Sequence, residues 1–183
     1  MKRMAGSNRG IIAILAALAL WLGSIAPLWA AAATPAESSV SVTYVNPEQF
    51  TENRLYGRQD RFNRIDYLAQ LKAYLIKQGQ AVLKPGQSLH VDITDIRLAG
   101  AYEPWRGPQW DYVRIMRDIY SPRIDLNFRL VDQDGNVLRE GKRALRDLNY
   151  LYSGTSVPGA TGSSLYYDKA LLRRWLRRGP DKL

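Results

Sequence analysis

Carboxylates are the side chains in this sequence with the most scope for chemistry. Asp92 and Asp95 lie three residues apart, and such a pair could act as general acid and base or bind a hard cation such as Ca²⁺. Glu103 and Asp111 follow, so a hydrolase built on carboxylates is one reading. On a strand, however, residues three apart face opposite sides unless an extra residue intervenes. The structural alternative is ion pairing with a nearby arginine: Arg97, Arg114 or Arg117.

Two other polar patterns point away from catalysis. Asp132, Asp134 and Asn136 resemble the start of a calcium loop, but glycine comes at the fourth position rather than the sixth, and Arg143 stands where the bidentate glutamate belongs. A hairpin turn explains these residues better. His90 is the single histidine and alternates with apolar residues, so we expect it to be solvent-exposed. We predict no catalytic, metal or cofactor site and favour a non-enzymatic protein.

An aromatic segment is the first candidate for binding. Tyr102, Trp105 and Trp110 lie with Arg106 in a stretch rich in proline and glycine, which predicts a loop at residues 100–110. Large aromatic side chains on a loop either fold back onto the sheet edge or contact a partner. The second alternative gives a contact surface for an envelope protein, or for a glycan whose apolar faces stack on indole.

Arginines near the carboxyl end are the second candidate. Four of them lie on one predicted helix: Arg173, Arg174, Arg177 and Arg178. They could form a solvated face that offsets the helix dipole. Alternatively, they could bind anionic lipid or a cell-wall polymer, because the chain has a net charge of +9.

The amino-terminal segment has the three parts of a secretory signal peptide. Basic residues (Lys2, Arg3 and Arg9) precede an apolar run at residues 11–22, and small residues follow as far as Ala33. We expect cleavage near Ala30 or Ala32, with a signal peptide at residues 1–32; an uncleaved anchor helix is the alternative. The chain has no cysteine, which excludes a lipid-modified cysteine and disulfides. We therefore expect a periplasmic or secreted protein without a stable transmembrane anchor and without a nucleic-acid partner.

The pattern after the signal peptide predicts one domain. A flexible leader at residues 33–39 precedes a domain at residues 40–183, which is long enough to bury a core without disulfides or metal. Apolar alternation predicts strands at 40–45, 89–98 (with a β-bulge near Thr94 or Asp95), 123–130 and from 137. We thus expect an α+β fold: an antiparallel sheet with two main helices on one face, in the order β-α-β-β-β-α.

The two helices follow from apolar spacings of three and four residues. The first is expected at residues 61–78 with Gly79 as its C-cap, and the second at residues 166–178 with Ser163 or Ser164 as its N-cap. A loop rich in glycine and serine at residues 154–164 precedes the second helix.

Several segments resemble a bacterial family known as domain of unknown function 3016. They are residues 40–50 (VSVTYVNPEQF), 89–100 (LHVDITDIRLAG), 117–124 (RDIYSPRI) and 165–175 (LYYDKALLRRW). The resemblance covers essentially the whole expected domain. It implies a small exported proteobacterial protein with a signal peptide and no assigned activity, so no catalytic residue is carried over.

Overall fold

The computed structural model describes residues 38–63, 66–152, 165–179 and 182–183. The expected signal peptide with its cleavage site, most of the leader, the loop at residues 154–164 and the caps Ser163 and Ser164 lie outside these residues. Within the described ranges, no helix is both long enough and apolar enough to cross a bilayer.

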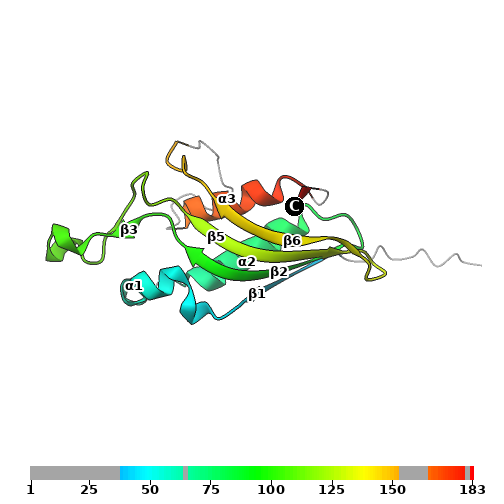
Figure 1. The fold of residues 1–183 in the computed structure, drawn as a ribbon, viewed down its shortest axis with the longest axis horizontal. Coiled ribbons are helices and arrows are strands. Elements are labelled where there is room, and N and C mark those ends of the chain that lie inside the picture. Colours follow the sequence, from blue (N-terminus) through cyan, green and yellow to red (C-terminus); the bar gives the residue numbers. More distant parts are fainter. Residues whose placement is uncertain (1–37, 64–65, 153–164, 180–181) are drawn as a thin grey trace, which may run out of the picture. The chain divides into compact units, whose positions relative to one another are not determined.

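A four-stranded sheet organises the domain, in the order β1-β2-β5-β6 (Figure 1). Its strands are β1 (Ser39–Tyr44), β2 (Ser88–Arg97), β5 (Arg123–Val131) and β6 (Val137–Arg146). β2 pairs antiparallel with β5, and β5 with β6, whereas β1 pairs parallel with β2. The expected α+β fold is confirmed, but the sheet is mixed. β1 and β2 run in the same direction because two helices lie between them in the chain, and these helices return the chain to the end of the sheet at which β1 begins.

Local signals in β2 and at the β5–β6 turn are confirmed. The β2 register shifts between Ile93 and Asp95, and this bulge keeps both Ile93 and Ile96 in the core. At the turn, Asp132 accepts hydrogen bonds from the backbone N–H groups of Asp134 and Asn136 at 3.0 and 2.8 Å. These bonds lower the pKa of Asp132, together with the larger contribution of the Asn136 side chain.

The prediction of one helix before β2 is wrong. The chain forms α1 (Thr51–Phe62) and α2 (Tyr67–Gln80), and Asp66 caps α2 by accepting from Ala69 N–H at 2.9 Å. Gly79 is inside α2 and is not its C-cap. A Cβ atom at Gly79 would lie 2.9 Å from Cγ2 of Val40. The glycine therefore serves close packing of α2 on β1.

Helices α2 and α3 (Tyr166–Leu176) supply the other half of the core. Leu71 and Leu75 of α2 are buried, as are Leu171 and Trp175 of α3. The Trp175 ring meets Phe128 of β5 edge to face at 5.9 Å. The expected apolar stripe of the closing helix is therefore the one that faces the sheet.

Alanine substitutions at two buried helical glycines test the close packing at Gly79. Gly57→Ala should raise the free energy of unfolding by up to ~1 kcal/mol, because alanine favours helix and a Cβ there meets no atom closer than 3.6 Å. Gly79→Ala should lose this gain through the contact with Val40. Urea unfolding of both variants checks the difference, and equal stabilisation would contradict the assigned role of Gly79.

Candidate contact arm and its buried anchor

Residues 99–122, here called the arm, leave the sheet after β2 and return to it at β5 (Figure 1). A short antiparallel ribbon of β3 (Ala101–Tyr102) and β4 (Arg114–Ile115) forms its stem. Two 3₁₀ turns, η2 (Pro104–Arg106) and η3 (Pro108–Trp110), form its tip. The expected loop at residues 100–110 is thus more ordered than its composition indicated.

The arm exposes large apolar side chains. Trp105 is 72% exposed and Ile119 67%. Val113 and Met116 are exposed on the same segment. Apolar side chains gathered on one projecting segment are typical of a contact surface.

The other predicted binding residues of the arm differ from Trp105. Tyr102 is buried, and its hydroxyl donates to Oδ1 of Asp60 at 2.8 Å, so its placement on the contact surface was wrong. Trp110 is half-buried, with the Arg106 guanidinium 4.9 Å from its ring centroid. Trp110 and Arg106 therefore cover each other, which leaves Trp105 as the more accessible indole.

A buried arginine joins the stem of the arm to α1. The side chain of Arg114 is only 8% exposed and forms ion pairs with Glu52 and with Asp60, the latter at 3.1 Å. Its Nη1 also donates to the carbonyl oxygens of Ala99 and Gly100 at 3.2 Å each. The Arg114 guanidinium further lies 4.7 Å from the ring centroid of Tyr102. Arg114 therefore satisfies charges and carbonyls from three segments at once.

Carboxylates hold the root of the arm through backbone amides. The N–H of Leu98 donates to Oε2 of Glu52 at 2.8 Å, and that of Ala99 donates to Oδ1 of Asp168 at 3.0 Å. The next residue, Gly100, donates its N–H to the Tyr120 carbonyl at 2.9 Å. Since Asp168 belongs to α3, this root is tied to helices from both ends of the domain sequence.

A second buried carboxylate closes the arm on itself. Glu103 is fully buried and accepts from the Tyr120 hydroxyl at 2.9 Å. Its Oε2 lies 3.4 Å from Nε of Arg106 and 3.3 Å from Nη2 of Arg117. Glu103 therefore has a structural role between the two halves of the arm.

Burial shifts the proton affinity of the anchoring carboxylates. Desolvation raises the pKa of Glu52 to about 7, against the opposing attraction of Arg114. Desolvation likewise raises the pKa of Asp168 to about 6, against the lowering effect of the hydrogen bond from Ala99 and of the Arg114 charge; its Oδ2 has no hydrogen-bond partner. Burial alone would lower the pKa of Arg114, but Glu52 and Asp60 together raise it above its ordinary value. The charge on Arg114 is therefore permanent.

The remaining sequence candidates lie elsewhere. Asp95 accepts from Thr51 N–H and Oγ1 at 2.6 and 2.8 Å and pairs with Arg123 at 3.3 Å. Its role is structural as expected, but its partners are not the predicted arginines.

Asp92 and exposed His90 line an open groove of about 730 Å³ on the sheet face opposite the helices, where Nδ1 of His90 lies 2.7 Å from Oγ of Ser41. Among the described residues, no group of three or more potential ligands could hold a metal.

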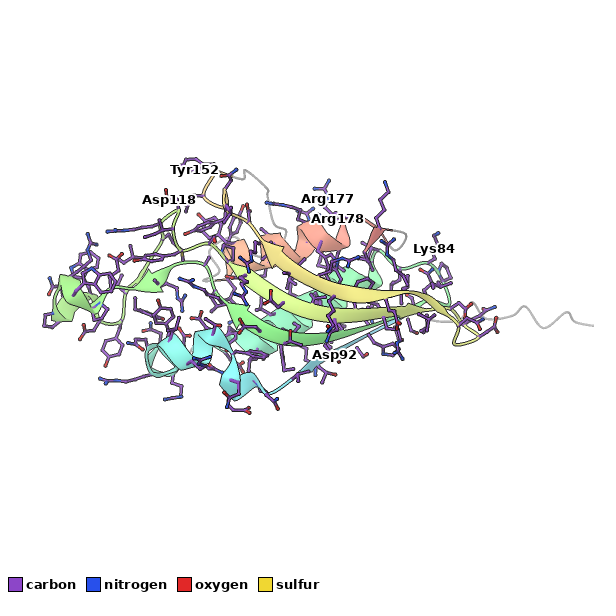
Figure 2. All side chains as sticks on the ribbon, viewed as in Figure 1. Lys84, Asp92, Asp118, Tyr152, Arg177 and Arg178 are labelled. Carbon is purple, nitrogen blue, oxygen red and sulfur yellow. The ribbon has the colours of Figure 1, made fainter. Side chains whose placement is uncertain are left out.

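The predicted arginine face is only partly free. Arg173 is half-buried, and Arg174 pairs with Asp147 of the segment after β6 at 2.7 Å. Arg177 and Arg178 are exposed just beyond the end of α3 (Figure 2). The structure therefore separates Arg173, which is half-buried, and Arg174, which is exposed but ion-paired, from the exposed Arg177 and Arg178.

Sequence reasoning missed Glu52, Asp60 and Asp168. The two acids of α1 are eight residues apart, which places them on similar sides of a helix. A polar stripe on a helix ordinarily indicates solvent exposure. Their burial depends on the arm, which comes 40 residues or more later in the chain, so no local signal identifies it.

Removing the buried cation tests the anchor. Arg114→Met should lower the free energy of unfolding by about 3–5 kcal/mol, because it leaves Glu52 and Asp60 buried without their partner. Arg129→Met is the matched control: Arg129 pairs with Glu140 at the surface, where the two side chains are 61% and 58% exposed, and we expect a loss below about 1 kcal/mol. Chemical denaturation measures both variants. Similar losses would show that Arg114 has no special role.

The raised pKa of Asp168 predicts a pH dependence of stability. Because this pKa is about 6 in the folded protein, against 3.8 for an unperturbed aspartate, the native state binds the proton more tightly than the unfolded chain does. The resulting stability is present at low pH and is lost as pH rises through about 6. Between pH 8 and pH 5, Asp168 should contribute a gain of about 1.4 kcal/mol.

The variant Asp168→Asn isolates this contribution, since the amide oxygen can still accept from Ala99. Unfolding free energies at pH 5 and pH 8 should differ by about 1.4 kcal/mol less in the variant than in the parent. An unchanged pH dependence in Asp168→Asn would contradict the assignment.

Comparisons with known proteins place the chain in a family. No curated protein matches it. The crystal structure of lipoprotein GNA1162 from Neisseria meningitidis is similar over 70% of this chain and 91% of that one, with 14% identity and a TM-score of 0.24, too low to support an argument from structure. A family model described as "Protein of unknown function (DUF3016)" matches residues 38–178. The chain therefore belongs to the DUF3016 family, as the sequence segments indicated.

Proposed function

We propose that this protein is an exported, non-enzymatic binding protein of the bacterial envelope, and that the arm is its contact surface. The observation that carries the proposal is Trp105, 72% exposed on a segment held by buried charges. Burying one large apolar side chain contributes about 1.5–3 kcal/mol. A partner that covers Trp105 would thus gain a substantial part of its binding energy from this side chain.

The anchor supports the same proposal. A flexible loop loses conformational entropy when it becomes ordered on binding, whereas a pre-ordered one does not. Arg114 and Glu103 order the stem and the tip before any partner arrives. If the arm had no contact role, this pre-ordered structure would keep Trp105 and Ile119 exposed to water without a function.

The chemistry of the arm favours a protein partner over a glycan. Besides Trp105, the arm exposes the aliphatic or thioether side chains of Val113, Met116 and Ile119. Sugars stack on aromatic rings, while protein interfaces use aromatic, methionine and aliphatic side chains together. The sequence also offered carboxylates for a hydrolase. Two of these, Asp95 and Glu103, are already engaged in ion pairs, so they are weaker candidates for function than the arm.

Site-specific photo-crosslinking in the native envelope tests this proposal. A benzophenone amino acid in place of Trp105 should give one recurrent protein adduct, whereas the same group at exposed Lys84, far from the arm in Figure 2, should not. A crosslinker at Ile119 should lose this adduct when Trp105→Ala is added, with unchanged thermal stability. Scattered adducts at every position would overturn the proposal, and a recurrent glycan adduct would replace the protein partner.

A further inference from the structure

Basic residues are concentrated on β6 and α3. Residues 137–146 together with 166–178 contain nine lysines and arginines against two acidic residues, while the rest of residues 33–183 contains 14 against 15. The net positive charge of the domain thus comes entirely from these two segments, since the rest has a net charge of −1. They are Arg139, Lys142, Arg143 and Arg146 in the first, and Lys169, Arg173, Arg174, Arg177 and Arg178 in the second.

The fold brings the two segments together. β6 is an edge strand, α3 lies along it in Figure 1, and the pair between Arg174 and Asp147 joins α3 to the chain just after β6. Cations of β6 face both sides of the sheet edge, because residues alternate along a strand. Arg139 and Arg143 lie on the helix-covered face of this edge, opposite the core residues Leu130 and Leu126, whereas Lys142 and Arg146 lie on the other face. The cations of both faces, together with those of α3, are here called the β6–α3 border.

The acidic residues of these segments do not neutralise the border. Glu140 is already paired with Arg129 at 3.1 Å, and Asp168 is fully buried. Lys142, Arg146, Arg177 and Arg178 are exposed, and their side chains form no ion pair with the described part of the chain. Four cations are therefore available to an external anion.

We propose that the β6–α3 border binds a linear, phosphate-bearing polyanion. Seven of the nine cations are arginine, whose planar guanidinium binds phosphate in a bidentate manner. The cations of β6 run from Arg139 to Arg146, a span of roughly 23 Å at about 3.3 Å per residue, so they follow one strand at the edge of the sheet. This site is separate from the arm and goes beyond the contact function proposed for it.

A flat lipid surface fits the border less well. Membrane-bound helices combine basic residues with large apolar side chains that enter the bilayer. On α3 these side chains, including Leu172 and Trp175, are buried against the sheet. Val137 and Leu138 are exposed at the hairpin end of β6, but α3 offers charge without an apolar anchor of its own, which suits a soluble chain of phosphates.

Inorganic polyphosphate is the probe for this site, measured by fluorescence anisotropy with labelled chains. The full-length mature protein should bind in a salt-dependent manner. Two double variants, Lys142→Gln with Arg146→Gln and Arg177→Gln with Arg178→Gln, should each weaken binding roughly tenfold or more at 100 mM salt and reduce the slope against log salt by roughly 1 to 2.

The matched control removes the same charge elsewhere. Arg54→Gln with Arg61→Gln, both exposed on α1, should change binding less than threefold, and Trp105→Ala should leave it unchanged. Equal loss in the α1 control, or binding to vesicles with 30% anionic phospholipid but not to polyphosphate, would overturn the proposal. Trp105→Ala changes only the arm. If the polyphosphate proposal fails, the arm proposal is therefore unaffected and is tested separately by the crosslinking experiment.

Discussion

The arm exists as an ordered element because one guanidinium is buried between two carboxylates. Arg114 pairs with Glu52 and Asp60 of α1 and binds the carbonyls at the root of the arm. Taking these charges out of water is costly, and only complete pairing offsets that cost. The position of the arm is therefore coupled to α1: neither can move far without exposing or orphaning a charge. The apolar side chains of the arm can remain in solvent because the ion pairs of Arg114, and not the burial of these side chains, hold the arm in place.

Much of the fold could be predicted because its signals are local. Alternation predicts the strands, and the phase change after Ile93 predicts the bulge that keeps Ile96 inside. The prediction of a single helix at residues 61–78 missed α1 because the buried side chains of α1 include the acids Glu52 and Asp60, so no apolar spacing marks this helix in the sequence. From the sequence, Gly79 has the position of a helix C-cap. Its actual role is to let α2 pack closely on Val40 of β1, and local sequence does not reveal this distant contact.

The candidate site was less predictable because burial of polar residues is a tertiary property. Composition identifies Trp105 and Trp110, but the difference in their exposure arises from the stacking of Arg106 on Trp110. Tyr102 looks like its neighbours in the sequence, yet its hydroxyl meets Asp60 in the interior. In the same way, Arg177 could be identified as a cation from the sequence, whereas its membership in one border with β6 required the strand order.

The parallel pairing of β1 bears on the order in which this chain folds. Ser41 and His90, which touch across this pair, are 49 residues apart, while β5 and β6 join through a short turn. Closing the longer loop costs more entropy before any contact is gained. We therefore expect the β5–β6 hairpin to form early and β1 to be added late, together with the packing of Gly79 of α2 on Val40 of β1. Until then the edge of β2 is open, so the folding chain is most exposed to strand-mediated aggregation before β1 has docked.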